Sequence, residues 1–231
     1  TEVLIIGQGL AGTWLSWWLH KAGISFKVID NASASGASIH SAGLINPVTG
    51  RRLVKTWMID ELMPFAWESY REMASFLQMD LISETRVVDF FPTVQMLQAF
   101  QKRCAEDAAF LQMDETRQQS FSHGYPENPG LPVAAGKGPA FGKEAPKFDQ
   151  WFRFDLGWGT IGPCYLVQVQ RLLTAWRTHL RGNNLLIEED FDLRLLTLSG
   201  HFIEYGNIRS SCVIFCDGSR SATSPFFEKL P

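Results

Sequence analysis

The feature that most constrains this chain is a GxGxxG segment at residues 7–12, which directly follows a short apolar stretch. Residues 3–6 are apolar and rich in β-branched side chains, as is typical of a strand buried on both faces of a parallel sheet. Residues 13–23 carry apolar side chains at helical spacing and end in a glycine. A second apolar stretch, residues 26–29, ends at Asp30. This order predicts a strand, a tight turn, a helix and a second, parallel strand.

Each glycine of the turn, and the acid after the second strand, has a distinct physical role in such a unit. Gly7 permits the tight turn, Gly9 lets the backbone approach a pyrophosphate, and Gly12 lets the helix pack closely on the strand. The N–H groups at the helix start would hold the phosphate charge, and Asp30 would accept hydrogen bonds from a ribose. A turn without a ligand explains Gly7 and Gly12 but not Gly9 and Asp30. The sequence therefore predicts a dinucleotide site.

Composition narrows the classes of function. The 231 residues carry a formal net charge of −3, which argues against nucleic acid as a partner because phosphate binding needs concentrated positive charge. No apolar run approaches a membrane span, so no transmembrane segment is expected, and no signal peptide is recognised. The cysteines lack metal-ligand spacing, so we expect no metal site. We predict that Cys104, Cys164, Cys212 and Cys216 are free thiols. Because thiols stay reduced in the cytoplasm, this predicts a cytoplasmic protein.

The rest of the chain again alternates between helical and strand-like patterns. Helices are predicted over residues 56–77, 94–111 and 165–180. Strands are predicted over 86–91, 151–154, 185–187 and 211–216, with a hairpin over 193–205 that turns at 199–200. Residues 120–147, dense in Gly and Pro, are expected to be irregular, and the glycine-rich residues 157–163 to form a turn. We predict an α/β fold: a Rossmann-like domain with a central parallel sheet, interrupted by a partial α+β domain.

Four segments carry a family resemblance. They are residues 3–12 with Asp30, residues 41–47 with the sequence SAGLINP, residues 159–166, and residues 214–218. Together and in this order they resemble the D-amino-acid oxidase, glycine oxidase and sarcosine oxidase superfamily of FAD-dependent oxidoreductases. The resemblance implies FAD rather than NAD as the cofactor. It also implies an FAD-binding domain made of residues 1–82 and 159–231, with a substrate domain at residues 83–158.

The resemblance further implies which residues bind the cofactor. They are drawn from the glycine turn, the end of the second strand, the flavin-side segment, the adenine side and the last strand. These residues are Gly7, Gly9, Leu10, Ala11, Gly12, Asp30, Asn31, His40, Ser41, Ala42, Gly43, Leu44, Phe191, Asp192, Asp217 and Gly218. The sequence shows no acid–base pair, so no catalytic side chain is assigned.

The reaction implied by the resemblance is oxidation of a C–N bond of an amino acid or secondary amine by hydride transfer to flavin N5. Family members run well beyond 231 residues, so we expect this chain to be a truncated form. The alternatives are a non-catalytic or fragmentary nucleotide-binding domain and an NAD-linked dehydrogenase. The sequence leaves open the substrate, the electron acceptor and the oligomeric state.

Two interpretations are open for each of three basic residues, His40, Arg51 and Arg52. The segment around His40 is similar to dimethylglycine and sarcosine dehydrogenases, in which a histidine just before Ala-Gly-Leu is covalently bonded to the flavin. The alternative is a loop histidine that is hydrogen-bonded near the cofactor or exposed. Arg51 or Arg52 could face the cofactor or an anionic substrate, or both could be solvated.

Overall fold

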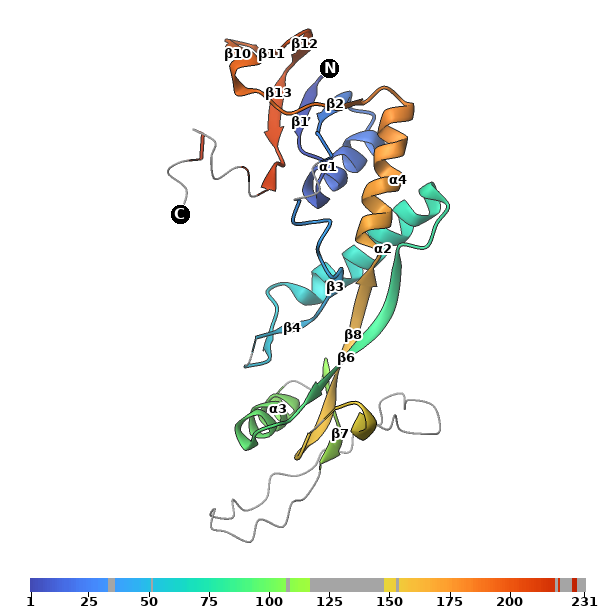
Figure 1. The fold of residues 1–231 in the computed structure, drawn as a ribbon, viewed down its shortest axis with the longest axis vertical. Coiled ribbons are helices and arrows are strands. Elements are labelled where there is room, and N and C mark those ends of the chain that lie inside the picture. The colour runs from blue at the N-terminus through green and yellow to red at the C-terminus, as the bar shows by residue number, and fades with distance from the viewer. Residues whose placement is uncertain are drawn as a thin grey trace. The chain divides into compact units, whose positions relative to one another are not determined.

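The computed structural model describes residues 1–32, 36–50, 52–106, 109–116, 148–152, 154–218, 220 and 226–227. The chain divides into two compact units (Figure 1). The first comprises Thr1–Gly43, Arg71–Leu81 and Val167–Pro231, and the second Leu44–Tyr70 and Ile82–Leu166. The domain boundaries at residues 82 and 158 stay a prediction. The segment 120–147, Arg51 and Arg153 lie outside the described residues.

The first unit is built on a parallel sheet with the strand order β13-β1-β2-β9; Figure 1 labels β13, β1 and β2. The strands are β1 (Val3–Ile6), β2 (Phe26–Ile29), β9 (Leu186–Ile187) and β13 (Cys212–Phe215), and each neighbouring pair is parallel. β1 is buried along its whole length because the sheet has neighbours on both faces. This arrangement confirms the predicted Rossmann-like α/β fold.

Two helices of the first unit, α1 (Leu10–Lys21) and α4 (Val169–Gly182), meet through aromatic side chains. Trp176 is fully buried, and its Nε1 donates a hydrogen bond to Ser16 Oγ at 2.8 Å. Its ring meets Trp17 edge to face, with 5.7 Å between ring centroids. Edge-to-face contacts of this kind add to the energy of apolar burial. They fix α1 against α4 and so hold the glycine turn at one end of the sheet.

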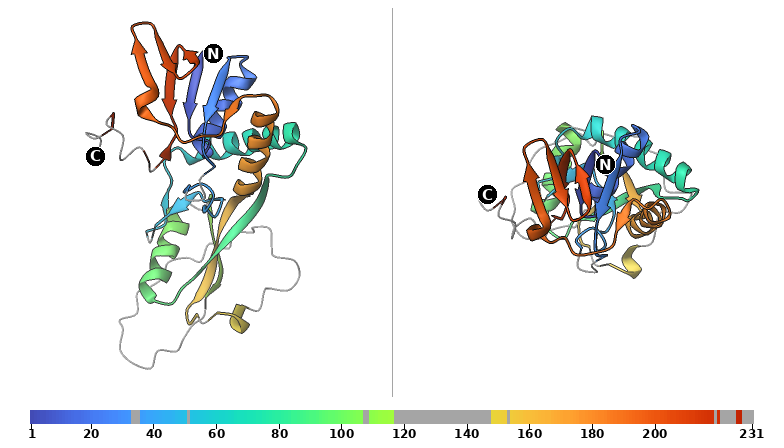
Figure 2. Two further views of the ribbon diagram at one scale, coloured as in Figure 1. Left: turned by 45° about the horizontal axis from the view of Figure 1, so that its top comes forward. Right: turned by 90° about the horizontal axis from the view of Figure 1, so that it is seen from above.

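A small antiparallel sheet lies between β9 and β13 in chain order and is formed by β10 (Leu196–Ser199), β11 (Phe202–Tyr205) and β12 (Ile208–Ser210). Figure 2 shows it beside the parallel strands, and a short 3-10 helix, Leu193–Leu195, precedes it. Tyr205 packs into the same apolar cluster as Leu4, Ile6 and Ile29 of the parallel sheet. The predicted hairpin is confirmed, and β12 is a strand that the sequence reading missed.

The second unit is α+β. Its main sheet has the order β3-β8-β6, and β7 also pairs with β8. Phe91 and Phe100 are completely buried at its centre, together with Ile161 and Cys164. Its elements are β3 (Leu44–Ile45), β4 (Val48–Thr49), β5 (Val54–Lys55), β6 (Ile82–Phe90), α3 (Val94–Glu106), β7 (Leu111–Thr116), a 3-10 helix (Phe148–Gln150), β8 (Gly157–Val167) and the first part of α2 (Ile59–Leu77).

Three local predictions were wrong. Residues 157–163 are not a turn before a helix but the first part of the eleven-residue strand β8, and the helix begins only at Val169. The reason is packing: a Cβ at Gly159 would lie 2.6 Å from the Phe100 ring, so glycine is needed here for close approach and not for a turn. Residues 151 and 152 form a turn end instead of the predicted strand. The predicted helix 94–111 ends at Glu106, and β7 begins at Leu111.

Among the described residues, no helix has the length and apolar character that crossing a membrane requires. The cysteines Cys104, Cys164, Cys212 and Cys216 are free thiols. Within the same described part of the chain, no group of three or more His, Cys, Asp or Glu side chains could hold a metal ion.

The aromatic cluster formed by α1 and α4 predicts a pH dependence of stability. His179 stacks on Trp176 with 4.7 Å between centroids, and burial lowers its pKa from 6.5, with the charge of His20 as a second cause. The folded state therefore favours neutral His179. The free energy of unfolding is highest above pH 6.5 and falls as the pH drops below that value, because protonation of His179 favours the unfolded state. We expect His179→Leu to lose less stability than the parent between pH 7 and about 5, measured by urea unfolding. His201→Leu, which changes an exposed histidine, is the control and should keep the parental pH dependence.

Candidate functional site

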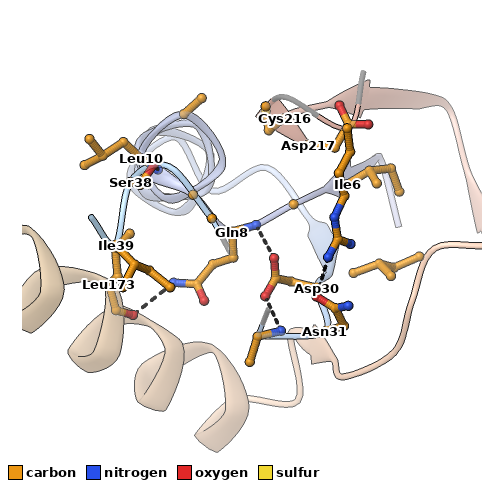
Figure 3. A pocket seen from close by; sticks show the side chains of 18 of the residues that line it. Ile6, Gln8, Leu10, Asp30, Asn31, Ser38, Ile39, Leu173, Cys216 and Asp217 are labelled. Atoms are coloured by element: carbon orange, nitrogen blue, oxygen red, sulfur yellow. Dashed lines mark hydrogen bonds between the residues drawn. The ribbon is translucent and has the colours of Figure 1, made fainter. Parts of the chain in front are cut away.

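A pocket of about 960 Å³ lies in the first unit, where its parallel strands end (Figure 3). Ile6, Ile29 and Phe215, the last residues of β1, β2 and β13, all line it. The carboxyl ends of parallel strands are where open α/β sheets bind ligands. The volume is at the upper end of the range of small-molecule sites, roughly 300–1,000 Å³, so the pocket can hold an extended ligand.

The three glycines of the turn differ in what surrounds them. Gly7 has a φ of +99°, and a Cβ on it would lie 2.5 Å from Cys216 O. A Cβ on Gly12 would lie 1.9 Å from Gly7 O. A Cβ on Gly9 would meet only the Ser38 side chain, at 3.1 Å from Oγ. The packing of the fold thus requires Gly7 and Gly12, whereas Gly9 leaves an open approach to the backbone from the pocket.

The helix α1 begins at Leu10, and Gly9 at its N-cap position has no side chain that could cap the helix. The Leu10 N–H donates to Ser38 Oγ at 3.1 Å, so a hydroxyl already stands where a ligand oxygen would accept. Unpaired N–H groups and the positive dipole end make a helix start favourable for an anion. Leu10, Ala11 and Ser38 all line the pocket, which places this helix start in its wall.

Asp30, at the end of β2, has both carboxylate oxygens engaged. Oδ2 accepts from Gln8 N at 2.9 Å, and Oδ1 accepts from Ala32 N at 2.8 Å (Figure 3). Oδ1 also pairs with Arg177 Nη1 of α4 at 2.6 Å. The predicted ribose acid therefore lies in the pocket wall, held by backbone and side-chain donors.

Gln8, a variable position of the glycine motif, joins the turn to α4. Its side chain is buried, and Nε2 donates to Leu173 O at 3.0 Å (Figure 3). Its Oε1 accepts from Arg177 Nη1 at 3.0 Å. Sequence reasoning missed both Gln8 and Arg177 because their roles depend on a helix far along the chain. Helical spacing places Arg177 one turn after Leu173, but the sequence alone does not indicate that Leu173 lines a pocket.

Two further groups shape the pocket beyond the glycine turn. Phe191 stacks on Tyr205 with 5.2 Å between ring centroids and 20° between planes, and it presents a flat apolar wall. Arg220 supplies a second positive charge and donates to Asn31 Oδ1 at 3.4 Å. Burial raises the pKa of the Cys216 thiol, so this pocket residue is neutral at physiological pH. Sequence reasoning missed Arg220 and Cys216.

The predicted cofactor residues divide into those that line this pocket and those that do not. The lining residues are Gly7, Gly9, Leu10, Ala11, Asp30, Asn31, Phe191, Asp217 and Gly218. The predicted residues outside the lining are Gly12, His40, Ser41, Ala42, Gly43, Leu44 and Asp192. For the residues of both groups, binding of the cofactor stays a prediction.

Local structure explains several residues outside the lining. A Cβ on Gly43 would lie 2.1 Å from Val167 O, so close backbone packing requires glycine there. Asp192 caps the 3-10 helix after it, and the hydrogen bond from the Arg194 side chain lowers its pKa to about 2. His40, Ser41 and Ala42 are exposed.

The residues present fit a dinucleotide. An open glycine backbone and a helix start suit a pyrophosphate, a carboxylate at the end of β2 suits a ribose, and a flat aromatic ring suits a base. Gly9, Asp30 and Phe191 supply these groups within one pocket. Arg177 and Arg220 add positive charge near the predicted phosphate and ribose positions.

Comparison with known proteins gives a family match. Residues 2–159 match the model of the FAD dependent oxidoreductase family. A search of curated proteins finds no match.

Several solved structures share the fold. Glycine oxidase from Geobacillus kaustophilus superposes with a TM-score of 0.65 at 16% identity, covering 96% of this chain and 56% of that one. Iminodiacetate oxidase from Chelativorans sp. BNC1 gives 0.63 at 14% identity, with 96% and 56% covered. L-amino acid deaminase from Proteus vulgaris gives 0.58 at 14% identity, with 93% and 46% covered. The chain thus spans about half the length of these structures.

The contact between Gly12 and Gly7 predicts a strong effect of a single methyl group. Gly12→Ala places a Cβ 1.9 Å from a backbone oxygen, which cannot rotate away as a side chain could. We expect a loss of about 3 kcal/mol or more in unfolding free energy, measured by urea denaturation followed by circular dichroism. The matched control is Gly182→Ala in α4, where no atom lies within 4 Å of the added Cβ and stability should not fall. Equal stability of the two variants would contradict the packing account.

Proposed function

The chain belongs to the FAD dependent oxidoreductase family. We propose that it catalyses the oxidation of a C–N bond in an amino acid or secondary amine. FAD, the predicted cofactor, is the cofactor of this family. The proposed FAD site is the pocket of the first unit. The substrate class is proposed from the amino-acid and amine oxidases with which the chain shares its fold.

The observation that carries the proposal is the joint placement of Gly9, the start of α1 and Asp30 in one pocket wall. We propose that the pyrophosphate lies against the backbone of residues 9–11 and the adenosine ribose against Asp30. The adenine then lies near the Phe191 ring, which gives the pocket a flat apolar wall.

The residues of this chain bind FAD and orient it. The chemistry that bound FAD supplies is a two-electron oxidation of the C–N bond. Backbone N–H groups at the start of α1 bind the negatively charged pyrophosphate, and Asp30 fixes the ribose. The apolar side chains of Ile6, Ile29 and Phe215 exclude water from the end of the sheet. No catalytic acid or base is assigned among them.

The flavin-side segment, residues 40–44, is proposed to run beside the isoalloxazine ring. Its neighbour Ile39 lines the pocket, and the Ile39 carbonyl accepts from Gln170 Nε2 of α4 at 2.9 Å, which anchors this loop to the helix. His40, next along the chain, is exposed. Mass spectrometry of the denatured, FAD-loaded protein tests the covalent reading: a flavin adduct on His40 supports it, and an unmodified chain excludes it.

The alternative is a nucleotide-binding module without catalysis of its own, and it rests on the same pocket, whose lining residues bind and orient a ligand. The two proposals separate in one experiment. The purified chain is titrated with FAD and followed by flavin absorbance and fluorescence, and is then assayed with glycine, sarcosine and D-amino acids using oxygen and an artificial acceptor. FAD uptake with substrate oxidation supports the enzyme, and uptake without oxidation supports the module. A chain that takes up no FAD contradicts both.

Gly9 offers a test that separates cofactor binding from folding. Gly9 has an unstrained φ of −73°, and an added Cβ would meet only the Ser38 hydroxyl. We expect Gly9→Ala to lose less than about 1 kcal/mol of stability, because one flexible side chain can yield. The same methyl group would stand between the backbone and a pyrophosphate, so FAD affinity should fall about tenfold or more, measured by quenching of flavin fluorescence. Unchanged FAD affinity in a folded Gly9→Ala protein would place the cofactor elsewhere.

A further inference from the structure

We propose that Arg177 is a positioning residue that restricts Asp30 to reading one hydroxyl of the adenosine ribose. The inference rests on the proposed FAD site and deepens it, because it assigns a recognition rule to that site. A ribose presents two adjacent hydroxyls, and a free carboxylate could accept from both. In this chain the pairing of Arg177 with Asp30 removes part of that capacity.

Asp30 has a limited number of acceptor positions. A carboxylate has two oxygens and about four lone-pair positions. Oδ1 uses two of them, for Ala32 N at 2.8 Å and Arg177 Nη1 at 2.6 Å. Oδ2 uses one, for Gln8 N at 2.9 Å. One position, on Oδ2, is left for a ligand, so direct contact is available to a single hydroxyl.

Arg177 is held firmly enough to keep Oδ1 occupied. Its Nη1 donates to Gln8 Oε1 at 3.0 Å as well as to Asp30 Oδ1, and its Nη2 donates to Asp30 O at 2.9 Å and to Glu188 Oε2 at 3.2 Å. The two terminal nitrogens carry four hydrogens, so these four acceptors use them all. The side chain is 13% exposed, and leaving its place would break all four contacts at once.

Charge reinforces this placement. Glu188 is exposed, and hydrogen bonds from Arg181 first and Arg177 second lower its pKa to about 2, so it is negative at neutral pH. Arg177 therefore lies between two carboxylates, those of Asp30 and Glu188. A ribose hydroxyl is a neutral donor and competes poorly with a guanidinium for Oδ1.

A merely structural role for Arg177 makes a different prediction. Through Gln8, Arg177 also ties the glycine turn to α4. If that were its whole effect, its loss would weaken binding of every nucleotide by the same factor. A positioning role instead changes how affinity depends on the two ribose hydroxyls. The hydroxyl dependence is therefore the decisive measurement.

The experiment measures dissociation constants of the full chain for ADP, 2′-deoxy-ADP and 3′-deoxy-ADP by isothermal titration calorimetry at one salt concentration. In the parent, we expect one deoxy compound to bind about tenfold more weakly than ADP and the other to bind within about threefold of it. Arg177→Met vacates one position on Oδ1, and both deoxy compounds should then bind more weakly than ADP. Arg181→Met, on the next turn of α4, contacts Glu188 but not Asp30 and should keep the parental pattern.

Each other outcome overturns a defined part. Equal losses for the two deoxy compounds in the parent, where Arg177→Met cannot interfere by misfolding, overturn the inference alone. A parental pattern retained in a folded Arg177→Met protein also overturns it. Absence of any ADP binding overturns the proposed cofactor site and the inference with it. Failure of substrate oxidation, with ADP binding and the hydroxyl pattern intact, overturns only the proposed enzymatic function.

Discussion

The close approach of α1 to the end of β1 is the constraint on which the first unit depends. A Cβ on Gly12 would lie 1.9 Å from Gly7 O, so the helix can come this near only because position 12 has no side chain. Gly7 is confined in turn by Cys216, which follows β13. One turn therefore locks together a helix and two neighbouring strands, and the pocket exists because these three elements meet there.

Polar groups then connect this turn to the far part of the chain. Gln8 extends from the turn to the Leu173 carbonyl on α4, and Arg177 returns from α4 to Asp30 at the end of β2. These contacts lie mostly out of water, where a satisfied network gives rigidity and an unsatisfied one would be costly. The pocket wall is therefore set in place by the protein itself, which lowers the cost of ordering a ligand.

Local patterns in the sequence predicted much of this unit and of its site. The apolar run at residues 3–6, the glycine turn and the hairpin at residues 199–200 depend on neighbours along the chain, and each was found. β8 was missed because Gly159 was read as a turn residue, although it makes room for Phe100 across the second unit. Arg177 was missed because it meets Asp30 over a separation of 147 residues, which no local pattern encodes. Sequence thus predicts backbone motifs well and the side chains that support them poorly.

We propose that FAD binds with its pyrophosphate at the start of α1 and its adenosine ribose at Asp30. The decisive measurement is a crystal structure of the full chain with FAD. We expect pyrophosphate oxygens within hydrogen-bond distance of backbone N–H groups in residues 9–11 and a ribose hydroxyl at Asp30 Oδ2. FAD bound away from the glycine turn, or with its ribose out of reach of Asp30, would contradict this proposal.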